Sequence, residues 1–206
     1  MLNSFSAAWN SLYTKHQSEY KTGGITITEK GVEAKNKSLT VVCDEVVSFP
    51  SKQFDSYDLF SALTNRNCDS VLLVKNEEGG YDLVYIEMKS RFDSHECFDA
   101  KCQIAETSAK MQSLFQMMKP YAALPIRKVY GVIEHQQLDE DQEDLWSKLQ
   151  QLPDSELDFG WKLIKYGTIK GKTHFKPELD MPSEMIFRLL LSDDAHYSVN
   201  YGDLCK

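Results

Sequence analysis

Positive charge is scarce in this 206-residue sequence, which has 23 Lys and Arg residues against 31 Asp and Glu residues and a formal net charge of −8. Non-specific affinity for nucleic acid comes mainly from Lys and Arg side chains that displace phosphate counterions. The composition therefore argues against a large basic footprint, although it is compatible with a local basic groove. Acidic ligands clustered in a metal site would also make the net charge negative.

The motifs of several common functions are absent. The five cysteines are odd in number and form no Cys-x-x-Cys pair, which argues against a disulfide framework and against a structural zinc site. The sequence also contains no Gly-rich phosphate loop, no G-x-S-x-G motif and no internal repeat. These absences leave the P-loop, α/β-hydrolase and solenoid classes without support.

Long apolar runs are absent as well. No run approaches the roughly 18 apolar residues of a membrane span, and Met1–Tyr20 lacks the charged start and apolar stretch of a signal peptide. We therefore expect a soluble cytoplasmic protein with no membrane partner. The length suits one domain with a sizeable core.

The most informative stretch is CDSVLLVKNEEGGYDLVYIEMKS, which begins at Cys68. Two apolar, β-rich runs, Ser70–Val74 and Tyr81–Ile86, are joined by Asn-Glu-Glu-Gly-Gly, a composition typical of a hairpin turn. If the turn occupies these residues, the register places Asp69 directly opposite Glu87. The stretch therefore predicts an antiparallel hairpin with two carboxylates facing each other.

Opposed carboxylates are destabilising unless something compensates their charge. Because side chains alternate along a strand, Lys89 returns to the face of Glu87. A divalent cation would relieve the repulsion, since Mg²⁺ binds through one or two carboxylates together with water and phosphate oxygens. Such an ion can activate water for displacement at phosphorus, while the lysine stabilises the developing charge. The pattern is therefore compatible with metal-assisted displacement at phosphorus.

Asp69 before one strand, followed by Glu87-Met88-Lys89 at the end of the next, resembles the D…(D/E)-x-K signature of the PD-(D/E)XK, or restriction-endonuclease-like, nuclease superfamily. The resemblance implies that Asp69 and Glu87 bind Mg²⁺ or Mn²⁺, that the Met88 carbonyl can join them, and that Lys89 assists hydrolysis. Cys68 stands where the family name has proline, which many members lack. The implied fold is α/β, with a central mixed β-sheet flanked by helices in a restriction-endonuclease-like core.

Two helices are expected to flank this sheet. The first begins at Asn3 or Ser4 and runs to about Tyr20, and a periodic apolar stripe that ends before Pro120 predicts the second over residues 97–118. By resemblance, Glu19 on the first helix is a candidate further carboxylate, although a solvated glutamate is the stronger interpretation. The resemblance adds Gln103 on the second helix to the catalytic candidates.

Three other polar residues are weaker candidates. Lys101 on the second helix is a minor addition to the site, and Lys110 on the same helix is interpreted as solvated. His135 follows a predicted strand and has no acidic partner at a readable spacing, so we interpret it as a surface histidine.

Further β-structure is expected on both sides of the central hairpin. Ile25–Glu29 and Leu39–Phe49 predict a second hairpin beside it. Residues 1–152 form the predicted nuclease-like core, and residues 153–206 form a β-rich extension packed on the same domain. Phe159–Pro177 has no acid and interleaves lysines with aromatic residues, which suggests β-hairpins. This ribbon could contact phosphates and unpaired bases, or it could equally be a solvated edge strand.

The sequence therefore predicts a Mg²⁺- or Mn²⁺-dependent nuclease whose partner is nucleic acid, with DNA favoured over RNA. The predicted catalytic residues are Asp69, Glu87, Lys89 and Gln103, and the predicted metal ligands are Asp69, Glu87 and Met88. The alternative is a catalytically inactive module on the same fold that binds nucleic acid or a protein partner. The small number of basic residues suggests that a homodimer or a protein partner completes the substrate groove.

Overall fold

The computed structural model describes residues 1–14, 17–29, 38–50, 67–89, 94–118, 124–136, 147–172, 184–192 and 194–205. The main sheet has seven strands, in the spatial order β1 (Glu19–Thr22), β4 (Glu45–Pro50), β5 (Ser70–Lys75), β6 (Tyr81–Lys89), β7 (Ile126–Gln136), β9 (Glu184–Ser192) and β8 (Thr168–Lys172). A smaller sheet has three strands, in the order β10 (His196–Asn200), β3 (Ser38–Val42) and β2 (Ile25–Thr28). The helices with described bounds include α1 (Leu2–Leu12), α2 (Ser94–Met118), α4 (Phe159–Tyr166) and α5 (Tyr201–Leu204).

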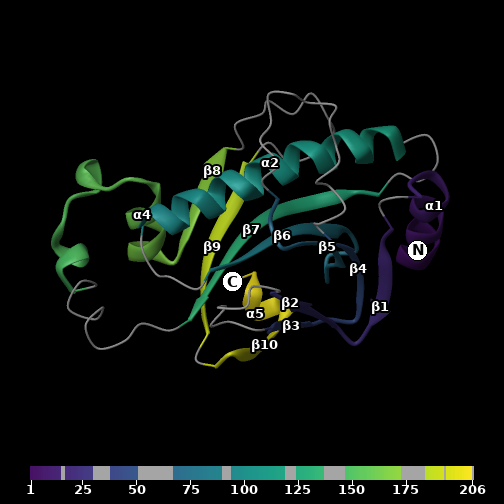
Figure 1. Ribbon diagram of the computed structural model, residues 1–206, viewed down its shortest axis with the longest axis horizontal. Helices are drawn as coiled ribbons and strands as arrows, with labels where there is room; N and C mark the ends of the chain where they lie inside the picture. Colours follow the sequence, from purple (N-terminus) through teal and green to yellow (C-terminus); the bar gives the residue numbers. More distant parts are fainter. Residues whose placement is uncertain are drawn as a thin grey trace.

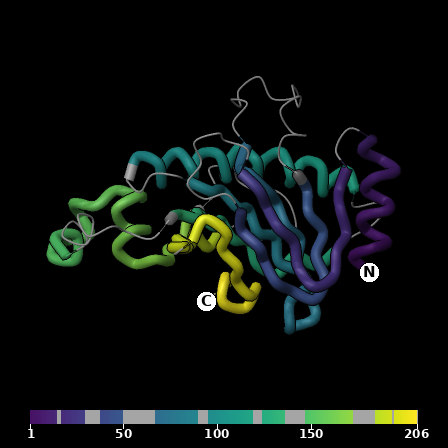
Figure 2. Tube along the Cα trace, turned by 60° about the horizontal axis from the view of Figure 1, so that its bottom comes forward, coloured from purple at the N-terminus to yellow at the C-terminus, as the bar shows by residue number. Residues whose placement is uncertain are grey.

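The main sheet is mixed, which confirms the predicted α/β class. Strands β1, β4, β5 and β6 pair antiparallel, β6, β7 and β9 pair parallel, and β8 returns antiparallel to β9. Helix α2 lies across the sheet, with α4 near one end and α1 near the other (Figures 1 and 2). Residues 153–206 contribute β8 and β9 to the main sheet and β10 to the small sheet (Figure 1).

The two faces of the main sheet have different covers. Helices α1 and α2 share one apolar core with one face, where Trp9 and Leu114 belong to the same cluster as Tyr85. The small sheet covers the opposite face, where Leu39 clusters with Ile86. Because β5 and β6 are covered on both sides, nearly all their residues are buried, and their sequences are continuous apolar runs rather than alternating patterns.

One long antiparallel ribbon connects the two sheets. Its first arm passes from β1 into β2 through Gly23-Gly24, and its second arm passes from β3 into β4 through Cys43-Asp44. Gly24 has φ +126, and a Cβ there would lie 2.5 Å from the Val41 carbonyl oxygen. Glycine is therefore required where the ribbon bends from one sheet to the other.

This bend corrects the prediction for Leu39–Phe49. The run is not one strand, because it is divided between β3 in the small sheet and β4 in the main sheet. The predicted hairpin survives as the antiparallel pairing of β2 with β3. The spacing of Leu59, Phe60 and Leu63 in the sequence predicts a short helix over residues 56–63, which lie outside the described part of the chain.

The first helix is shorter than predicted. It ends at Leu12, and Glu19 lies in edge strand β1 instead of on the helix. The Glu19 side chain is 57% exposed and pairs with Lys21 at 3.1 Å, so the structure does not bring it to the hairpin acids. Pairing of β1 with β4 accounts for the error, because a long-range ladder replaced local helical preference.

The predicted basic β-ribbon is also wrong in its first half, because Phe159–Tyr166 is helix α4. Asp158 caps the helix by accepting a hydrogen bond from the Trp161 amide, and Gly167 ends it with φ 69. Lys165 and Lys170 both form ion pairs with acids. No helix within the described ranges is both long enough and apolar enough to cross a membrane.

Candidate active site

The β5–β6 hairpin has the predicted register. Leu73 pairs with Leu83 and Val71 pairs with Tyr85, so Asp69, directly before β5, falls opposite Glu87 near the end of β6. The turn is closed between Asn76 and Gly80, since the Asn76 amide donates to the Gly80 carbonyl at 3.1 Å. Because side chains alternate along this ladder, the Asp69 and Glu87 side chains lie on the same face of the hairpin.

Reciprocal hydrogen bonds hold the two acidic segments together. The Asp69 amide donates to Glu87 Oε2 at 3.1 Å, and the Met88 amide donates to Asp69 Oδ2 at 2.8 Å. The Met88 side chain is buried on the face covered by the small sheet, so only its backbone can serve the site. Because the N–H and C=O of a strand residue point to the same side, the Met88 carbonyl also faces the segment of Asp69.

Lys89 is the centre of a second set of contacts. Its Nζ lies 3.1 Å from Glu87 Oε1 and 3.6 Å from Glu96 Oε2, and it donates to Gln103 Oε1 at 2.7 Å. The structure therefore brings together Asp69, Glu87, Lys89 and Gln103. Lys101 is not part of this group, because its Nζ lies over the ring of Phe159, 4.5 Å from the centroid.

The electrostatics of this cluster are strained. Glu87 is 4% exposed, and burial first and then the neighbouring Asp69 charge raise its pKa to about 8, although Lys89 opposes the shift. Burial acts to lower the pKa of Lys89, but the carboxylates of Glu87, Glu96 and Asp69 together raise it. The lysine thus keeps its charge, while Glu87 is poorly stabilised as an anion.

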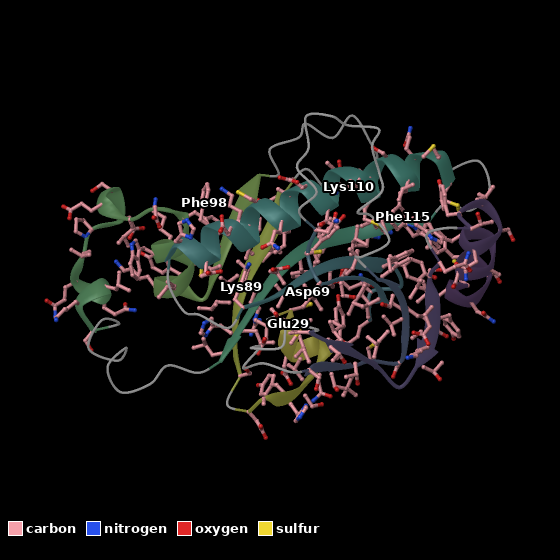
Figure 3. The ribbon with its side chains drawn as sticks, in the orientation of Figure 1. Glu29, Asp69, Lys89, Phe98, Lys110 and Phe115 are labelled. Atoms are coloured by element: carbon pink, nitrogen blue, oxygen red, sulfur yellow. The ribbon has the colours of Figure 1, made fainter. Side chains whose placement is uncertain are left out.

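Glu29 is a member of the cluster that we did not predict. It directly follows β2, its Oε2 atom is buried without a hydrogen-bond partner, and burial and the Asp69 charge raise its pKa. Figure 3 shows Glu29 near Asp69 and Lys89. The sequence signal was an acid ending an alternating strand. The signal does not show which residues the acid faces, because its surroundings form only when the small sheet packs on the main sheet.

The donor set fits a hard divalent cation. Two carboxylates and a backbone carbonyl, with Glu29 nearby, supply oxygen atoms of the kind that Mg²⁺ and Mn²⁺ prefer. Within the described residues, no group of three or more His, Cys, Asp or Glu side chains forms a ready-made metal site.

Two predictions of solvent exposure are wrong. Lys110 is 1% exposed, and its Nζ donates to Asn67 Oδ1 at 2.7 Å. His135 is 5% exposed and lies beside Lys89 in the parallel β6–β7 register. Both errors arise from packing of distant segments, because β7 lies between β6 and β9, and α2 lies against the segment before β5.

Comparisons with protein-family models, with curated proteins and with solved structures found no match for this chain.

Proposed function

We propose that this protein is a Mg²⁺- or Mn²⁺-dependent nuclease that hydrolyses phosphodiester bonds, with DNA the favoured substrate. The observation that carries the proposal is the convergence of Asp69, Glu87 and Lys89 at one end of the β5–β6 hairpin. The raised pKa of Glu87 supports it, because perturbed carboxyl groups concentrate at functional sites. The sequence resemblance to the PD-(D/E)XK nucleases points to the same chemistry.

Each residue has a distinct role in this proposal. Asp69, Glu87 and the Met88 carbonyl bind the metal ion, which when bound supplies Lewis-acid activation of water and charge neutralisation at phosphorus. Lys89 stabilises the negative charge that develops on the scissile phosphate. Gln103 orients the Lys89 ammonium group through their 2.7 Å hydrogen bond. Glu29 provides a further acidic oxygen on the side of Asp69.

The first experiment measures Mn²⁺ binding by calorimetry with Asp69→Asn. We expect the wild-type protein to bind Mn²⁺ and the variant to lose binding, because one of the two predicted carboxylate ligands is neutralised. Asp44→Asn is the matched control, since Asp44 is exposed at the bend between β3 and β4. Absence of Mn²⁺ binding by the wild-type protein would contradict the proposal.

The second experiment measures metal-dependent cleavage of labelled DNA and RNA with Lys89→Met. Loss of a preorganised charge that acts on the transition state costs about 10²–10³-fold in rate. Lys128→Met is the control, because Lys128 is an exposed lysine that also pairs with a glutamate, Glu78, at 3.7 Å. Equal background nicking by all three proteins would show that the cleavage does not belong to this site.

The alternative function is a catalytically inactive module that binds nucleic acid or a protein partner. In that case the 3.1 Å contact between Lys89 and Glu87 is only a structural ion pair. The same calorimetry separates the two functions, because the inactive module binds no Mn²⁺. Analytical ultracentrifugation with and without DNA then tests whether a homodimer completes the substrate groove.

A further inference from the structure

Asp69 lies in a segment outside the strand ladders of the main sheet. Residues 67–69 precede β5 and belong to no helix or strand. A carboxylate that must stay within about 0.5 Å of its productive position needs support from a packed second layer of residues. Asp69 itself is hydrogen-bonded to β6, and the two residues before it are hydrogen-bonded to α2.

A row of polar residues on α2, Gln103, Thr107 and Lys110, contacts the two residues before Asp69. Their spacing of four and three places all three on one side of the helix. Thr107 Oγ1 accepts a hydrogen bond from the Cys68 amide at 2.9 Å, and Lys110 Nζ donates to Asn67 Oδ1 at 2.7 Å. We call these three residues the α2 polar row.

Gln103 connects the polar row to both halves of the site. Its Nε2 donates to the Asn67 carbonyl oxygen at 3.4 Å, and its Oε1 accepts from Lys89 at 2.7 Å. Thr107 is linked to the same residue, because its hydroxyl donates to the Gln103 carbonyl at 2.8 Å. One helix face therefore holds the segment before Asp69 and the side chain of Lys89 in a single hydrogen-bonded arrangement.

Burial of Thr107 and Lys110 indicates that these two residues position the site and do not touch substrate. Thr107 is fully buried and Lys110 is 1% exposed, in contrast to a lysine that would contact a phosphate. A buried polar residue is costly unless its hydrogen bonds are made. The hydrogen bonds of Thr107 and Lys110 are satisfied only when Cys68 and Asn67 keep their positions.

We propose that Thr107 and Lys110 are positioning residues that hold Asp69 against Glu87 through Asn67 and Cys68. The inference rests on the proposed function for its catalytic meaning, but the geometry can be tested without metal. The reporter is the Met88 amide, because it donates its hydrogen bond to Asp69 Oδ2. Displacement of Asp69 releases this amide and leaves the ladder amide of Leu83 unchanged.

The experiment measures amide hydrogen exchange by nuclear magnetic resonance in metal-free Thr107→Val and Lys110→Met. We expect exchange of the Met88 amide to accelerate about tenfold relative to Leu83, the loss expected for one hydrogen bond. Thr107→Ser keeps the hydroxyl and should restore slow exchange. Ser113→Ala is the matched control, because the Ser113 hydroxyl donates to the Ala109 carbonyl of the same helix at 3.1 Å.

Mn²⁺ affinity is measured on the same proteins, and we expect both variants to bind about tenfold more weakly. Equal acceleration at Met88 and Leu83 would overturn the inference, since it would indicate general destabilisation. Unchanged Mn²⁺ affinity in a variant with a faster Met88 amide would also overturn it. If the wild-type protein binds no Mn²⁺ and the Met88 amide still responds selectively, the positioning role stands and the proposed function fails.

Discussion

Strand β6 carries two buried acids, and their surroundings are opposite in kind. Asp82 near its beginning is 3% exposed and Glu87 near its end is 4% exposed. Asp82 accepts hydrogen bonds from Asn76 Nδ2 and from the Tyr201 hydroxyl, which are both neutral donors. It thereby attaches the hairpin turn and the C-terminal helix α5 to the sheet.

Glu87 instead faces a second acid and a lysine. Its burial and the Asp69 charge raise its pKa to about 8, and Lys89 only partly offsets them. Burial alone therefore does not distinguish a carboxylate that stabilises the fold from one that belongs to a candidate functional site. The two acids differ in having a like-charged neighbour or not. Repulsion between Glu87 and Asp69 is unfavourable, and a bound cation would relieve it.

The largest expected effect is on the cleavage rate, which should depend on Glu87 and not on Asp82. Glu87→Gln should reduce metal-dependent cleavage by on the order of 10³-fold, because it removes the charge of a proposed metal ligand. Asp82→Asn should leave the rate within a few-fold of wild type. Asparagine can still accept from Asn76 through its oxygen, and the Tyr201 hydroxyl can rotate to accept from its amide.

Steady-state cleavage of labelled DNA with Mn²⁺ measures both rates. Circular dichroism on the same samples confirms that both variants are folded. A loss of activity as large in Asp82→Asn as in Glu87→Gln would break the distinction between the two ends of β6.

The next effect is a pH dependence of stability in the metal-free protein. The pKa of Glu87 is about 8 in the folded protein, and its ordinary value is 4.5. Between these values the folded protein retains a proton that the unfolded chain has lost, so stability falls as pH rises. The stability contributed by protonated Glu87 is fully present below about pH 4.5 and lost above about pH 8. Between these values the free energy of unfolding falls by at most about 1.4 kcal/mol per pH unit.

Urea unfolding between pH 5 and pH 8 measures this slope. Glu87→Gln should flatten it, because glutamine does not titrate, and Asp82→Asn should leave it in place. Glu29 adds a slope of the same sign, since its pKa is also raised. An unchanged slope in Glu87→Gln would show that the site near Glu87 is not electrostatically strained.

The smallest effect concerns the structural acid. Tyr201→Phe removes the hydroxyl that donates to Asp82, and it should lower the free energy of unfolding by about 1 kcal/mol without changing Mn²⁺ affinity. Tyr197→Phe on β10 is the matched control. A change in Mn²⁺ affinity with Tyr201→Phe would indicate that the two ends of β6 are coupled.

Local patterns predicted the central elements well. The turn composition and the two apolar runs gave the correct β5–β6 register, and a periodic stripe gave helix α2. Helix α4 had equally good local signals, namely a capping Asp158 and a terminating Gly167. We missed it because alternating lysines and aromatic residues were interpreted as a ribbon.

Errors elsewhere came from contacts between distant segments. Glu19 lies in a strand because β4 was available for pairing, and Lys110 is buried because its partner Asn67 lies far away in the sequence. Neither Glu29 nor Lys110 carries a local signal of its environment. Such residues can be assigned only when the packing of the sheets and of α2 is known.

The facing acids follow from local sequence, since loop length and side-chain alternation place Asp69 opposite Glu87 whatever surrounds them. The residues around these acids depend instead on the packing of distant segments. The bend at Gly24 directs Glu29 toward Asp69, and the packing of α2 brings the polar row against the segment before β5. The positions of Glu29 and of the α2 polar row both depend on packing between layers. Apolar surfaces drive this packing, and no local sequence pattern specifies it.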